Sequence, residues 1–138
     1  MILLDTNVVS ALMHATQDAV VGDWLNQQPR TSIWTTSITL FELRFGIEIL
    51  PLGRRRIALA EALARLLEKL EGRIAPLDAD AAQHAAELMA GRQKKGQPQE
   101  LRDTMIAGIA LARHATLATR NTAHFEDAGI PLINPWKA

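Results

Sequence analysis

The stretch Ile2-Leu3-Leu4-Asp5-Thr6-Asn7 decides how the rest of the chain is interpreted. A short apolar run over residues 1–4 ends at an acid, which indicates a buried strand that brings the Asp5 carboxylate to the edge of a sheet. Either Asp5 or Thr6 is suited to cap a short helix over residues 7–13, because both side chains can accept from the backbone N–H groups of a first turn. The stretch therefore leaves two roles open for Asp5, a helix cap and a functional acid.

Short apolar segments alternate with longer helical patterns along the remainder of the chain. Strands are predicted at 31–36, 115–119 and 130–133, with a short extended segment at 75–77. Helices are predicted at 17–27, 37–50, 54–70, 78–95 and 99–114, with Pro98 suited to the first turn of the last helix. Parallel strands need such helical crossovers. The pattern therefore predicts an α/β fold, a three-layer sandwich with a mostly parallel central sheet and helices on both faces.

Two neighbouring helices of this pattern form a predicted hairpin over about residues 37–71. The first carries Phe41 and Phe45 on apolar faces, and the second carries a leucine stripe over residues 59–70. Core packing is the simplest use of the leucine stripe, and a surface for a partner is the alternative.

Composition limits the classes of protein to which the chain can belong. Its 138 residues suit one domain over residues 1–138, with 48% apolar residues and 15 basic against 15 acidic ones. The zero net charge means that any nucleic-acid site has to be a local patch. The absence of cysteine excludes disulfides and thiolate metal sites. No charged leader and no apolar run of membrane-spanning length is present, so a soluble cytoplasmic protein is expected.

Three acids and one amide are predicted to meet at one edge of the sheet. Asp5 follows the first strand and Asn121 follows the strand at 115–119, and ligands of open parallel sheets bind beyond the carboxyl ends of the strands. Glu42 and Asp103 lie near helix starts, on rows with small or apolar residues. Buried carboxylates are costly unless they are paired or bind a cation. Mg²⁺ or Mn²⁺ fits such oxygen ligands, whereas zinc would need a histidine or cysteine cluster.

Each of these residues also has an ordinary structural explanation. Thr39 and Glu42 have the spacing of a capping box, and Asp103 suits the positive end of a helix dipole. Asn121 suits a turn. The residues alone leave these alternatives open, although their joint placement favours a site.

The ordered motifs of the chain resemble those of PIN-domain proteins, most of all the VapC/FitB-type toxins of bacterial toxin–antitoxin pairs. The resemblance spans almost the whole chain. The residues that carry it are Leu4-Asp5-Thr6-Asn7, Phe41-Glu42-Leu43, Asp103-Thr104, Thr119-Arg120-Asn121, His124-Phe125 and Ile133-Asn134-Pro135-Trp136.

This resemblance implies an Mg²⁺- or Mn²⁺-dependent endoribonuclease that hydrolyses RNA phosphodiester bonds. It implies a cognate DNA-binding antitoxin that neutralises the toxin, and a homodimer. It also implies that Asp5, Glu42 and Asp103 hold the metal and that Asn121 completes the catalytic set. The chain departs from the family at the fourth position, because many members have an acid where His124 stands. We therefore expect one strong metal site and a second that forms only with substrate.

Six further residues are candidate contacts for RNA. Thr6, Arg120 and His124 adjoin the predicted site, and Arg92, Lys94 and Lys95 form a basic patch just before the helix that bears Asp103. The alternative for Thr6 is a helix cap, and the alternative for Arg120 is a salt bridge to a site carboxylate.

Two other functions stay open at this point. A non-catalytic PIN-like scaffold that binds RNA or a partner is favoured by the missing fourth acid. An Mg²⁺ phosphatase would use Asp5 as its nucleophile, but that chemistry usually needs a second aspartate where Asn7 stands.

Overall fold

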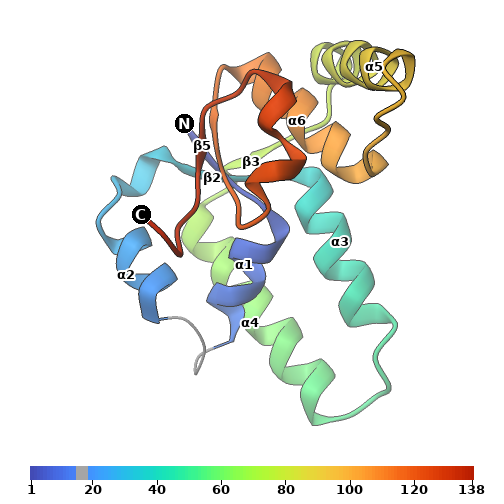
Figure 1. The fold of residues 1–138 in the computed structure, drawn as a ribbon. Coiled ribbons are helices and arrows are strands. Elements are labelled where there is room, and N and C mark those ends of the chain that lie inside the picture. Colours follow the sequence, from blue (N-terminus) through green and yellow to red (C-terminus); the bar gives the residue numbers. More distant parts are fainter. Residues whose placement is uncertain (15–18) are drawn as a thin grey trace.

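The computed structural model describes residues 1–14 and 19–138 and is built around one five-stranded sheet (Figure 1). The strand order is β3-β2-β1-β4-β5, and every neighbouring pair is parallel. The strands are β1 (Ile2–Leu4), β2 (Ile33–Thr36), β3 (Ile74–Ala75), β4 (Thr116–Ala118) and β5 (Leu132–Ile133). The predicted α/β sandwich with a parallel central sheet is confirmed.

Helices cover both faces of this sheet. They are α1 (Thr6–Met13), α2 (Ala19–Asn26), α3 (Ser37–Glu48), α4 (Arg54–Leu70), α5 (Ala79–Lys94) and α6 (Leu101–Arg113). Successive strand residues point to opposite faces. Leu3 accordingly belongs to the core beneath α5 and α6, whereas Leu4 belongs to the core beneath α1, α2 and α4. The predicted helix at 17–27 starts in a part of the chain that lies outside the described residues.

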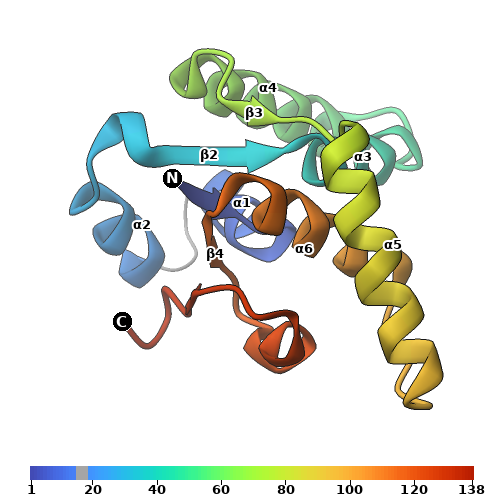
Figure 2. The ribbon, with the colours of Figure 1, turned by 90° about the horizontal axis from the view of Figure 1, so that it is seen from above.

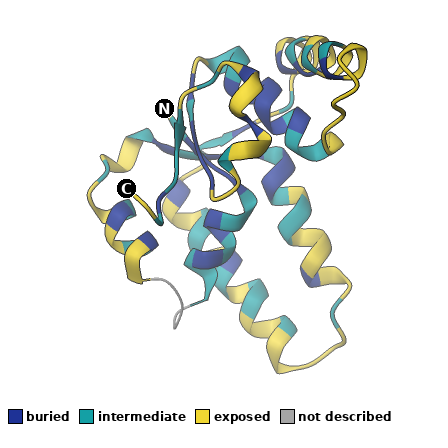
Figure 3. Ribbon diagram, viewed as in Figure 1, coloured by how far each residue is buried: buried dark blue, intermediate teal, exposed yellow. Residues whose placement is uncertain are grey.

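The hairpin of α3 and α4 extends away from the sheet, as Figure 1 shows. Its far end is coloured as exposed in Figure 3. Phe41 and Phe45 are 57% and 52% exposed and stack on each other, with ring centroids 6.3 Å apart. The apolar face predicted for these two residues is thus open to solvent, because α3 buries Ile38, Thr39 and Ile47 instead.

Several element boundaries also differ from the prediction. The predicted strand at 31–36 begins only at Ile33, because Arg30–Ser32 form a 3-10 turn in which the Ser32 hydroxyl donates to the Pro29 carbonyl at 2.7 Å. The predicted helix at 99–114 begins at Leu101, since the Glu100 side chain accepts from the backbone N–H of Asp103 and caps the helix. The strand predicted at 130–133 is limited to β5.

Helix α5 forms one outer edge of the molecule (Figure 2) and packs on α6 at unusually close range. A Cβ added at Gly108 of α6 would lie 2.6 Å from the Ala81 carbonyl oxygen, 2.7 Å from the Ala85 Cβ and 2.8 Å from the Ala85 nitrogen. The small residues of the alanine-rich helix and Gly108 therefore set the distance between the two helix backbones.

Replacement of Gly108 by alanine should separate these helices. The added methyl group meets backbone atoms that cannot move alone, so we expect Gly108→Ala to lower the free energy of unfolding by roughly 1–3 kcal/mol. Gly91→Ala is the matched control, because nothing lies within 4 Å of the added Cβ at that position of α5. It should raise the free energy of unfolding by roughly 0.5–1 kcal/mol through helix propensity. Urea denaturation of both variants checks the pair, and a Gly108→Ala protein as stable as the parent would contradict the close packing.

Candidate functional site

The predicted acids lie at the carboxyl edge of the sheet. Asp5 directly follows β1, α3 with Glu42 directly follows β2, and Asp103 is in the first turn of α6. Burial raises the pKa of Asp5, and the nearby charge of Asp103 raises it further. Burial likewise raises the pKa of Glu42, and the charges of Asp5 and Asp103 add to that increase. The three carboxylates are therefore near enough for each acid to feel the charge of the others.

The Asp5 carboxylate is 3% exposed and is held by three donors. The backbone N–H of Thr6 donates to Oδ1 at 2.8 Å, while the Thr119 hydroxyl and the Asn7 amide donate to Oδ2 at 2.6 and 3.2 Å. Asp5 is the N-cap of α1 and also a member of the acidic group, so the two roles left open by the sequence coexist. These hydrogen bonds favour the charged form, but burial outweighs them.

Glu42 is fixed beside Asp5 by Thr6. The Thr6 hydroxyl donates to Glu42 Oε1 at 2.9 Å and lies 3.1 Å from the Thr39 hydroxyl. The alternative of a capping box at Thr39 and Glu42 is wrong, because Thr36 is the N-cap of α3 and its side chain accepts from the backbone N–H of Thr39. Thr6 is not a cap either, since Asp5 has that role. Its hydroxyl is used to hold a site acid.

Asp103 is in contact with His124. The imidazole Nδ1 lies 3.1 Å from Asp103 Oδ2, and both side chains are partly exposed to solvent, at 48% and 22%. Asn121 is exposed, and its backbone N–H donates to the Thr119 hydroxyl at 3.1 Å, as in a turn. Of Asn121 and His124, the two candidates for the fourth position of the site, His124 is the one whose side chain contacts a site acid.

Sequence reasoning missed three residues of this site. Thr119 is buried and links Asp5 to the turn after β4, and Asn7 links Asp5 to the backbone of Arg120. Arg102 places Nη1 3.8 Å from Glu42 Oε2 and opposes the rise in the pKa of Glu42. Each of the three stands next to a predicted site residue in the sequence. That position could have suggested them, but it does not show which way a side chain points.

The prediction that Arg92 contacts RNA is wrong. Its side chain is only 3% exposed, and it donates to both carboxylate oxygens of Asp127 at 2.9 and 2.8 Å. It also donates to the Thr104 hydroxyl at 2.9 Å and to the His124 carbonyl at 3.0 Å. A buried guanidinium needs such partners, so Arg92 joins α5, α6 and the His124 turn. Lys94 and Lys95 are exposed at the end of α5.

The donor set fits a hard divalent cation. Within the described residues, no group of three or more acidic, histidine or cysteine side chains is already arranged to hold a metal ion. The carboxylates of Asp5, Glu42 and Asp103 are instead engaged by hydroxyl, amide and imidazole groups. Burial and neighbouring negative charge raise the pKa of Asp5 and Glu42, so a cation would stabilise this set of carboxylates. Oxygen is the ligand that Mg²⁺ and Mn²⁺ prefer.

Comparison with known proteins places this arrangement in a family. The family model described as PIN domain matches residues 2–130. The chain belongs to the PIN-domain family. A VapC ribonuclease of Sinorhizobium fredii is 41% identical over 99% of both chains, and Toxin FitB of Neisseria gonorrhoeae is 34% identical over 99% of both chains. A solved structure of FitAB bound to a DNA fragment contains a chain with a TM-score of 0.89 and 32% identity, which covers 99% of this chain and 96% of that one.

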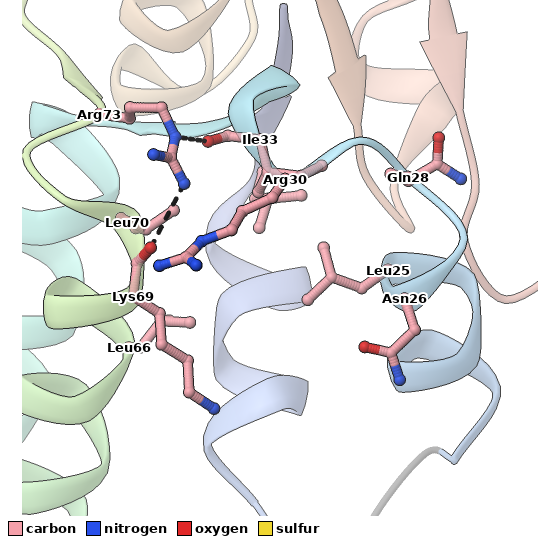
Figure 4. Close-up of a pocket in the computed structure, with 10 residues that line it drawn as sticks. Leu25, Asn26, Gln28, Arg30, Ile33, Leu66, Lys69, Leu70 and Arg73 are labelled. Atoms are coloured by element: carbon pink, nitrogen blue, oxygen red, sulfur yellow. Dashed lines mark hydrogen bonds between the residues drawn. The ribbon is translucent and has the colours of Figure 1, made fainter.

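A hollow of this PIN domain lies apart from the acids (Figure 4). It is a cavity of about 430 Å³ between α2 and α4, with Leu4, Leu66 and Leu70 among its apolar lining residues and with Arg30, Lys69 and Arg73 as its basic ones. Arg73 is fixed there, because it donates to the Ile33 carbonyl at 2.8 Å and to the Lys69 carbonyl at 3.3 Å. None of the predicted catalytic residues lines this cavity.

The acids of this PIN domain should make folding stability depend on pH. The pKa values of Asp5 and Glu42 are raised above 3.8 and 4.5, so the folded protein binds these protons more tightly than the unfolded chain. The stability from that binding is complete below these ordinary values and is lost as the pH rises through the raised values.

Glu42→Gln should therefore melt at the same temperature as the parent or higher at pH 7, and the difference should vanish well below pH 4.5. Thermal melts followed by circular dichroism across this range measure the effect. Glu87→Gln, an exposed change on α5, is the control. A lower melting temperature for Glu42→Gln at pH 7 would show that the charged form is the stabilising one.

Proposed function

We propose that this protein is a divalent-metal-dependent endoribonuclease and the toxin of a toxin–antitoxin pair. One observation carries the proposal: Asp5, Glu42 and Asp103 come from three different elements to one edge of the sheet, where the pKa of two of them is raised. A structural role alone does not require mutually repelling acids at a ligand-binding edge. The similarity to a VapC ribonuclease supports RNA as the substrate.

The three carboxylates would hold the cation, and the other residues would orient them. When bound, Mg²⁺ or Mn²⁺ stabilises charge on a phosphodiester oxygen and lowers the pKa of a bound water. Thr119 and Asn7 fix the orientation of Asp5, and Thr6 keeps Glu42 beside it. We expect one strong metal site, because the fourth catalytic position, Asn121, offers only a neutral oxygen.

The proposal includes partners as well as a substrate. Toxin FitB is a relative, and FitAB bound to DNA is a structural neighbour, which supports a cognate antitoxin that binds DNA. None of the helices in the described part of the chain is long and apolar enough to cross a membrane. We propose that the protein acts in the cytoplasm as a single domain.

We also propose a homodimer. Phe41 and Phe45 of α3 and its C-cap residue Ile49 are 52–66% exposed, and Leu52 in the connecting loop is 88% exposed. Exposed apolar surface of this kind is typical of a protein interface. Sedimentation equilibrium of the purified chain should give twice the mass of 15.2 kDa, and Phe45→Ser should shift the species toward the monomer. A monomer at all concentrations would rule out this part of the proposal.

The activity is tested by RNA cleavage. Purified protein should cleave single-stranded RNA with Mg²⁺ or Mn²⁺ and lose the activity with EDTA. Asp5→Asn and Asp103→Asn should each reduce the rate at least about a hundredfold, because a metal ligand contributes several kcal/mol of transition-state stabilisation. Glu87→Gln should cleave like the parent. Rates within twofold of the parent for both aspartate variants would refute the metal-site assignment.

A non-catalytic scaffold is the second candidate. Two observations favour it. The fourth predicted catalytic residue, Asn121, is not an acid, and the described residues hold no preformed metal cluster. Titration of Mn²⁺ followed by calorimetry separates the two functions. Saturable binding that is lost in Asp5→Asn supports the nuclease, and its absence in the parent protein supports the scaffold.

A further inference from the structure

Two residues that the proposed chemistry does not use lie together at the edge that carries the acids. Arg120 follows β4 by two residues, and Trp136 follows β5 by three. The two strands are parallel neighbours, with Leu117 opposite Leu132 and Ala118 opposite Ile133. Their carboxyl ends therefore meet at the same sheet edge as Asp5.

Arg120 is attached to the acid site through its backbone. Its N–H donates to the Asn7 side-chain oxygen at 3.1 Å, and the preceding residue, Thr119, donates to Asp5 at 2.6 Å. The Arg120 side chain is exposed, and its guanidinium carbon lies 4.6 Å from the centroid of the Trp136 ring. The guanidinium is thus held against the Trp136 ring, while the backbone of the same residue is tied to the acid site.

Trp136 is anchored so that its ring stays in place. It packs against the core that includes Leu4 and Ala118, and its backbone N–H donates to the Asn134 side chain at 2.9 Å. Its indole Nε1 is buried and has no hydrogen-bond partner among the described residues. An unpartnered buried donor destabilises the folded state, and phenylalanine would not carry one. Packing alone therefore does not explain why this position is tryptophan.

The contact with Trp136 leaves the guanidinium able to bind an anion. Within the described residues no hydrogen bond from the Arg120 side chain is found, so its N–H groups remain available as a fork, which suits phosphate. Within residues 1–14 and 19–138, the ion pairs found do not include Arg120, so the predicted alternative of a salt bridge to a site acid is not seen. The chain has no net charge to attract RNA, and the acids repel its backbone. The Arg120 guanidinium, fixed close to this edge of the sheet, would supply a local attraction for RNA and would offset the repulsion from the acids.

We propose, on the basis of the proposed ribonuclease function, that Trp136 holds the Arg120 guanidinium in place and that Arg120 binds a backbone phosphate of single-stranded RNA next to the bond that is cleaved. Arg120 is then a substrate-binding residue, and Trp136 is a positioning residue that acts through it.

Binding without cleavage tests the contact. In an Asp103→Asn protein without divalent cations, fluorescence anisotropy measures the affinity for a labelled single-stranded RNA. Adding Arg120→Gln should weaken binding roughly fivefold to tenfold, and the slope of log K against log salt should become shallower by about 0.7. Arg120→Lys should keep the slope but bind more weakly than the parent. Arg65→Gln, which removes the same charge from an exposed position of α4, should change neither quantity.

The role of Trp136 is tested by a double-mutant cycle. Trp136→Leu should weaken RNA binding severalfold in the parent and should have no effect when Arg120 is already glutamine. Trp136→Phe keeps an aromatic face, although a smaller one, so it should bind RNA more tightly than Trp136→Leu and more weakly than the parent; this variant reports on the ring if the leucine protein fails to fold. In cleavage assays with Asp103 intact, Arg120→Gln should raise KM severalfold and leave kcat within about twofold.

The outcomes separate this inference from the proposed function. If the wild-type protein does not cleave RNA, the proposed function fails. If it cleaves RNA but Arg120→Gln binds RNA with the parent's affinity and salt slope, the inference alone fails. Loss of a co-purifying antitoxin in Arg120→Gln, with RNA binding intact, would also overturn it and assign Arg120 to the protein partner.

Discussion

The hydrogen bond from Thr119 to Asp5, 2.6 Å long and buried, is the interaction on which the rest of the site depends. A carboxylate at 3% exposure needs donors, and here they come from three directions: the first turn of α1, the Asn7 side chain and the end of β4. The same contacts join two neighbouring strands and a helix. The hydrogen bonds that hold the Asp5 carboxylate therefore also tie the strands together at this edge of the sheet.

These contacts explain how a helix cap can also belong to the group of acids. A cap uses one oxygen of the carboxylate, and Asp5 Oδ1 accepts from the backbone N–H of Thr6. Thr6 then has its hydroxyl free for Glu42, which lies on the helix after the neighbouring strand. Between them, the adjacent residues Asp5 and Thr6 therefore cap α1 and hold Glu42 beside Asp5. Burial and the charges of neighbouring acids raise the pKa of Asp5 and of Glu42, which is a cost to folding and a property suited to binding a cation.

The sequence predicted what depends on periodicity and strand ends, and missed what depends on pairing across long separations. The parallel sheet and the position of Asp5 follow from apolar runs that end at polar residues, and the structure has both. Glu42 had a convincing local explanation as part of a capping box, because spacing alone cannot tell which threonine caps a helix. Arg92 looked like surface charge, because its partner Asp127 lies 35 residues away. The exposure of Phe41 and Phe45 was not predicted, because periodicity identifies an apolar face of a helix but not what covers that face.

The shortness of β1 has a consequence for how the molecule tolerates change. Its three residues place Leu3 in one core and Leu4 in the other, and the next residue is Asp5. Removal of one residue from this strand would exchange the faces of every side chain before the acid and move the acid by roughly 3.3 Å. The packing of Leu3 and Leu4 in opposite cores therefore fixes the position of the Asp5 carboxylate, so the length of β1 tolerates less change than the identity of its apolar residues.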